Sequence, residues 1–343
     1  MRRIMRWLAC AALSTAIALP VSEARAADQA LIDAARKEGK VRWYTVILVD
    51  EGIGPLVAGF KQRYPGIEID VTRANAVENA RKIIDEDKAG HHEADVFDGS
   101  TTAAPLFQAG LIAPYKADSA KDIPDRYKHP EGYWTALLLE FLAPGYNADL
   151  AKAEDVPKSY QDLLDPKWRG KLMWSAGQNL TGGPGFAANV TTVMGERDGV
   201  AYLEKLKRQD IIDIKGTGHD VIEALSAGRA PIALQIFTHH TVLERALGHH
   251  VEWIKMEPVL GFGNNIGLLK HAPHPNAGKL LIDFILSPEG QTVIRNANHI
   301  PASSKVDAAV PGLKNGFKVN YVSPLDVTER NAEWQATFNR IFR

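Results

Sequence analysis

Short β-rich runs alternate with amphipathic helical segments through the first part of the chain, and this order limits the fold more than any other feature. Strands joined by helices in this order run parallel, and such a sheet carries helices on both faces. The chain therefore predicts an α/β unit at its start. The expected strands and helices, in order, cover residues 41–46, 55–64, 67–72, 76–89, 94–97 and 103–108.

The same alternation restarts later and predicts a second α/β unit. Its expected elements cover residues 171–175, 199–209, 211–215, 221–227, 231–237 and 239–247. A strand over 266–269, a helix over 276–286 and a terminal helix over 324–343 follow.

The strand near residue 266 is expected to return to the first unit, so that two crossing strands form a hinge. The hinge segments are expected at 138–146 and 261–268. We predict a signal peptide over 1–26, a first lobe from 27–138 plus 264–315, a second lobe from 139–263 and a helical segment over 316–343.

Residues 1–26 have the three parts of a secretory signal peptide. Arg2, Arg3 and Arg6 give a positive start, residues 7–19 are apolar, and residues 24–26 form a small-x-small cleavage site. The apolar run is shorter than the roughly 20 residues of a membrane-spanning helix. We therefore expect export to the periplasm, by the general or the twin-arginine route, without direct membrane insertion.

Charge and cysteine content exclude several kinds of protein. Lys and Arg number 40 against 41 Asp and Glu, so no basic excess attracts nucleic acid. The only cysteine, Cys10, lies within the predicted signal peptide. A mature chain without it has no disulfide, thiolate metal site or cysteine nucleophile.

Ligands of open α/β sheets bind outside the carboxyl ends of the strands, where helix N-termini offer free N–H groups. The turns after the predicted strands are rich in small hydrogen-bonding residues, which suits a small polar ligand. The turn at Asn179 belongs to the same set. The candidate ligand-binding residues are Thr45, Arg73, Asn75, Ser100, Thr101, Thr181, Gly182, Thr217, His219, Thr238 and His239.

Several of these residues have a purely structural alternative. Residues 98–102 can be a turn with a helix cap as readily as a ligand contact. Residues 181–185 lack the lysine and the spacing of a phosphate-binding P-loop, so a flexible turn is the simpler interpretation. Arg73 can pair with an anion or lie at the surface.

Neither the histidines nor the carboxylates form an enzyme motif. The pairs His91-His92 and His249-His250 lie beside glycine at predicted turns, where we expect solvent, whereas His239 opens a helix at the predicted cleft. No nucleophile elbow or zinc-protease motif occurs in the sequence. We therefore expect a binding protein with no catalytic residues and no cofactor.

A series of segments in the expected order carries a family resemblance. The most specific segment is PKSYQDLLDPKWRGK at 157–171. The chain resembles periplasmic solute-binding proteins of ABC importers, in the branch of ferric-ion, phosphonate, phosphosugar and thiamine binders. The other matching segments are 43–45, 60–67, 94–97, 110–115, 132–134, 146–147 and 284–291.

The resemblance implies two α/β lobes that close over a ligand, and delivery to a membrane permease with a cytoplasmic ATPase. Ferric binders of this branch use tandem tyrosines after the strand that matches 232–237, whereas this chain has Thr238, His239 and His240. Phenolate suits Fe³⁺ better than imidazole does. We therefore expect a small anionic organic solute: a phosphonate, phosphate ester or carboxylate.

Two other functions stay open at this stage. The first is a ferric or other metal-ion binder that uses His239 and Glu257, with His219. The second is an exported hydrolase on the same fold, which turnover of phosphoesters or esters would reveal.

Overall fold

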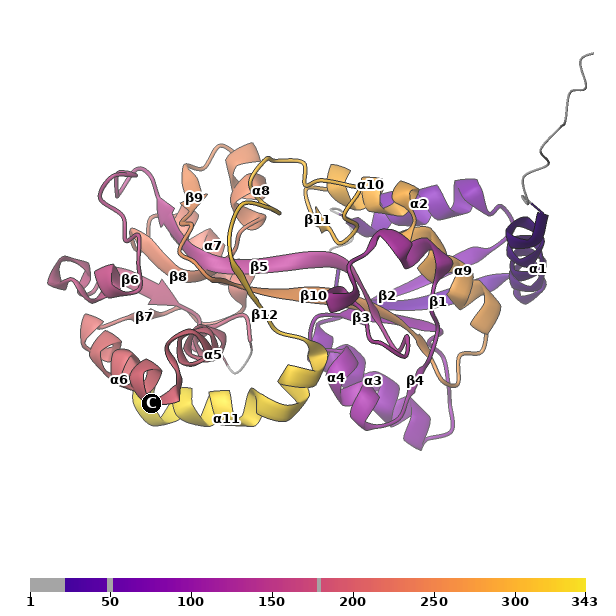
Figure 1. Ribbon diagram of the computed structural model, residues 1–343, viewed down its shortest axis with the longest axis horizontal. Coiled ribbons are helices and arrows are strands. Elements are labelled where there is room, and N and C mark those ends of the chain that lie inside the picture. The colour runs from indigo at the N-terminus through magenta and orange to yellow at the C-terminus, as the bar shows by residue number, and fades with distance from the viewer. Residues whose placement is uncertain (1–21, 48–51, 178–179) are drawn as a thin grey trace, which may run out of the picture.

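The computed structural model describes residues 22–47, 52–177 and 180–343, with side chains from residue 29 onward (Figure 1). The strands are β1 Lys40–Thr45, β2 Glu68–Arg73, β3 Val96–Gly99, β4 Ile112–Ala113, β5 Thr135–Asn147, β6 Leu172–Trp174, β7 Ile212–Asp213, β8 Ile232–Phe237, β9 Val251–Trp253, β10 Val259–Leu269, β11 Ile300–Pro301 and β12 Val319–Tyr321.

Eleven α-helices accompany these strands in the described residues. They are α1 Ser22–Glu38, α2 Gly54–Arg63, α3 Ala76–Lys88, α4 Ala103–Gln108, α5 Gly183–Met194, α6 Glu196–Leu206, α7 Gly218–Ser226, α8 His240–Ala246, α9 Pro275–Leu286, α10 Pro288–Asn296 and α11 Pro324–Phe342. Short 3-10 helices lie at Asp118–Asp122, Asp125–Tyr127, Gln161–Leu164, Pro166–Trp168 and Lys207–Gln209.

All described strands belong to one 12-stranded sheet, whose main order is β2-β1-β3-β10-β5-β8-β6-β7. Strands β2, β1 and β3 are parallel and form the first lobe, and β8, β6 and β7 are parallel and form the second. Between them, β10 and β5 pair antiparallel with each other, and each is antiparallel to its lobe neighbour. These two long strands connect the lobes (Figure 1).

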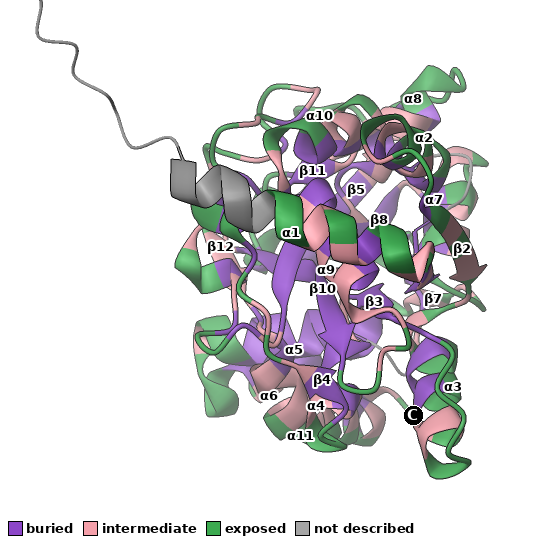
Figure 2. Cartoon of the chain, turned by 90° about the vertical axis from the view of Figure 1, so that its right-hand side faces the viewer, coloured by how far each residue is buried: buried purple, intermediate pink, exposed green. Residues whose placement is uncertain are grey.

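The core follows from this layering, because strands covered on both faces are almost entirely apolar. Strand β10 is buried along its whole length, and β8 is buried except for its last residue. Figure 2 shows the buried strands in the middle of the molecule and exposed outer faces on the surrounding helices. The central strands are therefore covered on both faces, whereas the edge strand β2 is partly exposed.

Helix α11 is the one long element that packs against both lobes in the described part of the chain. Phe338 and Ile341 pack in the core of the second lobe beside α5. Trp334 is buried with Leu142 and Phe262 of the crossing strands, and Figure 1 shows the start of the helix beside α4. The terminal segment thus fastens the lobes together on one side.

Most expected elements are confirmed within one to three residues, and α4 matches at both ends. Four differ from the expectation. The sequence also predicts a helix that Asp28 caps and that runs to about Glu38, whereas the observed helix begins at Ser22 and Asp28 lies inside it. Strand β10 is far longer than 266–269. The segment 316–343 begins with strand β12 rather than being helical throughout.

The fourth difference concerns residues 181–185, for which a flexible turn was the simpler interpretation. Residues 183–185 form the first turn of α5, which is buried over its first nine residues, and Gly182 is its N-cap. A Cβ on Gly185 would lie 1.6 Å from the Leu180 carbonyl oxygen, and one on Gly183 would lie 2.4 Å from the Phe338 ring. These glycines permit close packing, a requirement that depends on distant residues.

Candidate functional site

The carboxyl ends of strands from both lobes meet at the crossing strands. Gly99, the last residue of β3, pairs with Asn265 of β10. On the other side, the Thr238 amide, just after β8, donates to the Phe141 carbonyl of β5 at 2.9 Å. Glu140 of β5 lies next to this junction and pairs with Phe262. This convergence is where a doubly wound sheet binds its ligand.

Asp98 forms one part of the floor of this site. Its side chain is 0% exposed, and its Oδ1 accepts a hydrogen bond of 3.1 Å from the Val46 amide, while its Oδ2 is buried without a partner. Burial raises the pKa of Asp98 to about 7, and hydrogen bonds from Thr45 and Val46 oppose this rise. The carboxyl is thus costly to ionise in the unliganded site.

Glu140 is a second carboxyl in the same floor and the only charged residue of β5. Its Oε2 is buried and has no hydrogen-bond partner. Burial, and then the charge of Asp98, raise the pKa of Glu140 to about 8, whereas a hydrogen bond from Ser100 opposes the shift. Near neutral pH the two carboxyls therefore ionise reluctantly and oppose each other's ionisation.

Imidazoles from both lobes border the floor. His239 follows β8 and is 4% exposed, and its ring centroid lies 4.6 Å from that of His240 and 5.2 Å from that of His299. Burial lowers the pKa of His239 well below its ordinary value, that of His240 to about 3 and that of His299 to about 4. The three rings are therefore neutral at pH 7, and nitrogens on each are buried without partners.

Four of the candidate residues gather at this site. Ser100 lies against Glu140, and the Thr45 hydroxyl lies against Asp98 and accepts a hydrogen bond from the Ile47 amide. Thr238 and His239 lie at the end of β8, and the Thr238 hydroxyl is buried without a partner. Thr238 and His239 can donate hydrogen bonds to a ligand, whereas the Thr45 and Ser100 hydroxyls donate to Asp98 and Glu140 and can accept a hydrogen bond from it.

Other candidates lie farther out. Arg73 is exposed at the end of β2, the edge strand of the sheet. Asn75 caps α3 in a capping box with Glu78, and Thr217 caps α7 in the same way with Asp220. Both side chains therefore serve as helix N-caps.

Four more candidates lie around the rim. His219 is exposed and forms an ion pair of 3.3 Å with Glu223, and its ring lies 5.8 Å from that of His240. Thr101 lines a hollow of about 540 Å³ between α3, α4 and α11, together with Leu180 of the second lobe. Thr181 and the N-cap residue Gly182 begin α5, and Asn179 lies outside the described residues.

The metal-binding alternative finds no ligand set. Glu257 is exposed beside β10 and forms an ion pair with Lys255. In residues 22–47, 52–177 and 180–343, no group of three His, Cys, Asp or Glu side chains could hold a metal ion. The structure thus does not join His219, His239 and Glu257 into a coordination site.

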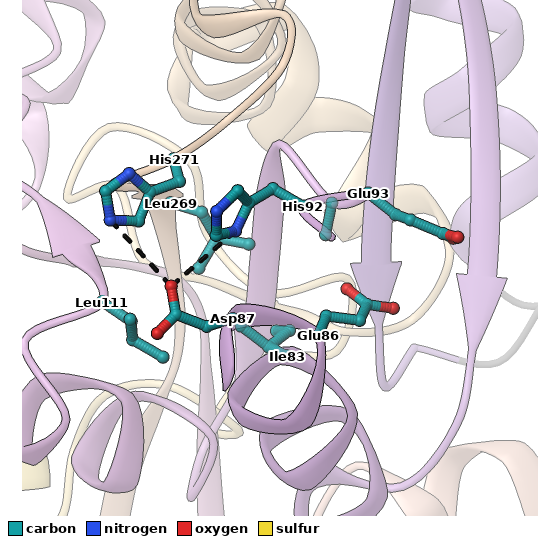
Figure 3. Close-up of a pocket in the computed structure, with 9 residues that line it drawn as sticks. Ile83, Glu86, Asp87, His92, Glu93, Leu111, Leu269 and His271 are labelled. Carbon is teal, nitrogen blue, oxygen red and sulfur yellow. Dashed lines mark ion pairs between the residues drawn. The ribbon is translucent and has the colours of Figure 1, made fainter. Parts of the chain in front are cut away.

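A second histidine cluster lies away from the carboxyl ends of the strands (Figure 3). Asp87 forms ion pairs of 3.7 Å with His92 and 3.9 Å with His271. The small cavity beside them also contacts Glu93 and Ala94, just before β3, and therefore lies at the opposite end of that strand from Asp98. Its volume of about 20 Å³ admits a single water molecule rather than an organic solute.

Comparison with known proteins identifies the family of this chain. The family model described as bacterial extracellular solute-binding protein matches residues 92–323. The chain belongs to this family. In the described residues, no helix is long and apolar enough to cross a membrane.

Named relatives of this solute-binding protein differ in ligand. A Salmonella typhimurium protein named "Putative 2-aminoethylphosphonate-binding periplasmic protein" is 32% identical over 58% of this chain and 59% of its own length. The Fe(3+)-binding periplasmic protein of Serratia marcescens is 23% identical over 71% of this chain and 73% of its own length. The match thus spans about three fifths of the first curated relatives, which are 62% and 59% covered.

Solved structures confirm the expected fold of this solute-binding protein. Iron-bound HitA from Pseudomonas aeruginosa has a TM-score of 0.72 at 21% identity, with 88% of this chain and 99% of that chain covered. The substrate binding protein of an ABC transporter from Agrobacterium tumefaciens has a TM-score of 0.74 at 17% identity, with 89% and 94% covered. These structural matches show that the chain has the two-lobed fold of type II periplasmic binding proteins. At such low sequence identities they show the fold alone.

Sequence reasoning missed three residues of the site: Glu140, Asn264 and His299. Glu140 had a visible signal, because it is a lone charge in the apolar run 136–143. Asn264 is a polar residue within a buried strand. His299 had no local signal, since only the fold brings it to His239.

Proposed function

We propose that this protein captures a small anionic organic solute between its lobes and delivers it to the permease of an ABC importer. The observation that carries the proposal is the convergence of unpartnered polar groups from both lobes at the crossing strands. Thr45, Ser100, Thr238 and His239 contact the ligand directly in this proposal. The remaining candidates contribute at the rim, with helix α5 directing its N-terminus toward the cleft.

A hydroxyl- and imidazole-rich site favours an organic anion over a bare metal ion. Neutral imidazoles, hydroxyls and backbone amides donate hydrogen bonds to phosphonate, phosphate or carboxylate oxygens. The tandem tyrosines of ferric binders are replaced here by His239 and His240. The Salmonella relative, whose name includes a phosphonate, supports the same ligand class.

The domain division supplies the mechanism of capture in this proposal. Residues 27–138 plus 264–315 form one lobe, residues 139–263 form the other, and β5 with β10 acts as the hinge. Ligand binding then shifts an open–closed equilibrium, and the permease recognises the closed form. Small-angle scattering checks this mechanism, because saturating ligand should reduce the radius of gyration.

Export and partners complete the proposal. Cleavage after residue 26 releases the mature chain into the periplasm, where it meets the permease and its cytoplasmic ATPase. N-terminal sequencing of the periplasmic protein should therefore begin at Ala27.

A thermal-shift panel tests the ligand class. A ligand at 100 times its Kd stabilises the folded state by about 2.7 kcal/mol. We expect a phosphonate, phosphate ester or carboxylate to raise the melting temperature, and Fe³⁺ to leave it unchanged. A response to Fe³⁺ alone would replace the anion proposal with the metal alternative, and hydrolysis of the added phosphate ester would indicate the enzyme alternative.

A further inference from the structure

Three hydrogen-bond acceptors without donors lie on β3, β5 and β10, at the crossing strands. Asp98 Oδ2, Glu140 Oε2 and Asn264 Oδ1 are all buried without a partner. Asn264 is 2% exposed, and its side chain lies against Asp98. A buried acceptor without a donor costs about 1–3 kcal/mol, and more if it is charged. Three such acceptors from three strands indicate a site suited to a ligand that donates several hydrogen bonds.

Among the residues that the structure describes, no side chain provides those donors. In the described part of the chain, neither Asp98 nor Glu140 forms an ion pair with a lysine, arginine or histidine. The neighbouring histidines offer no positive charge, because burial keeps them neutral. Two buried carboxyls without a protein cation are expensive to ionise, so both favour the protonated form until a ligand supplies a cation.

The chemistry of the acceptors restricts the kind of cation. A metal ion is disfavoured, since no three His, Cys, Asp or Glu side chains in residues 22–47, 52–177 and 180–343 form a metal-holding group. A primary ammonium has three N–H donors and no acceptor. It can therefore donate to Glu140, Asp98 and Asn264 at once, which satisfies each unpartnered oxygen.

We infer that the solute is a zwitterion whose primary ammonium group binds Glu140, Asp98 and Asn264, while its anionic group binds on the side of Thr238 and His239. This inference rests on the proposed function, because it assumes that a small anion enters the same cleft. The two sides of the proposed site suit the two charged groups of such a ligand. Unpartnered oxygens, which accept hydrogen bonds from an ammonium group, lie at the crossing strands, whereas a hydroxyl and imidazoles follow β8. A ligand with both charges also brings less net charge into a low-dielectric site than the corresponding anion without the amine does.

Isothermal titration calorimetry on the mature chain tests the inference with two matched probes. 2-Aminoethylphosphonate and ethylphosphonate have the same anionic group and differ in the amine. We expect the wild-type protein to bind the amino compound about 100-fold more tightly, as is typical when one partner of a buried charge pair is removed. Glu140→Gln should lose most of this preference and still bind ethylphosphonate.

Controls separate the possible failures. Glu131→Gln, at an exposed position just before β5, should retain the full preference. If Glu140→Gln fails to fold, judged by circular dichroism, Asp98→Asn replaces it in the same comparison. Equal affinity of the wild type for the two probes, or an unchanged preference in a folded Glu140→Gln, overturns the ammonium site and leaves the proposed function standing. Absence of binding to both probes and to every other anion overturns the proposed function and this inference together.

Discussion

The ring of His239, which follows β8 in the second lobe, lies 5.2 Å from the ring of His299, which precedes β11 (centroid to centroid). A Cβ on Gly52 of the first lobe would lie 3.6 Å from Nε2 of the same His299 ring. The two imidazoles therefore meet where the lobes meet, and their protonation is linked to the stability of this arrangement.

Acid should destabilise the protein through these imidazoles. Burial lowers the pKa of His299 to about 4 from 6.5. The stabilisation that neutral His299 provides is therefore present above pH 6.5 and is lost as the pH falls through about 4. Urea unfolding between pH 7 and pH 4 should show a smaller loss of free energy of unfolding in His299→Gln than in the wild type. His91→Gln, at an exposed position, should follow the wild type, and identical slopes for His299→Gln and the wild type would contradict this prediction.

Glu140 should have the opposite effect on the unliganded protein. Burial raises its pKa from 4.5 to about 8, so the folded state binds its proton more tightly than the unfolded state does. The contribution of protonated Glu140 is present below pH 4.5 and is lost as the pH rises through about 8. Glu140→Gln should therefore show a flatter decline in the free energy of unfolding between pH 6 and pH 9. A decline in Glu140→Gln as steep as that in the wild type would contradict this prediction.

Ligand binding should release a proton at pH 7 if an ammonium group meets Glu140. The unliganded carboxyl is mostly protonated there, because its pKa is about 8, and a neighbouring cation lowers that pKa. Calorimetric titrations with 2-aminoethylphosphonate in buffers of different ionisation enthalpy should show release of up to about one proton. Ethylphosphonate serves as the control and should release less, and proton uptake with the amino ligand would contradict the prediction.

Helix α11 should contribute strongly to stability through Phe338. This side chain is fully buried and packs against Gly183 at the start of α5. Phe338→Ala removes a large ring from a closed core and should lower the free energy of unfolding by about 3–5 kcal/mol. Leu247→Ala, at a side chain that is 75% exposed, should change it by less than about 0.5 kcal/mol. Similar losses in the two variants would mean that α11 is not docked as described.

Local pattern was sufficient for much of the fold. The period of the apolar residues predicted β1, α3, α4 and β8, and helix-ending glycines and prolines set many boundaries. The crossing strands were harder, because both faces of β5 and β10 are covered and their sequences are continuous apolar runs without alternation. Such a run does not reveal its own length or its partners.

The candidate site shows the same division between local and long-range information. The sequence by itself determined the family, the α/β lobes and the strand-end residues Thr45, Ser100, Thr238 and His239, because each of these features depends on neighbours within a few positions. Only the tertiary structure decided that Glu140 lies against Ser100 and that His299 lies against His239, since these pairs join segments far apart in the chain. It also decided that Asn75 and Thr217 cap helices and that the glycines after Thr181 pack a helix tightly. The physical reason is that burial, which shifts the pKa of each of these carboxyls and imidazoles, is a property of the assembled lobes rather than of any one segment.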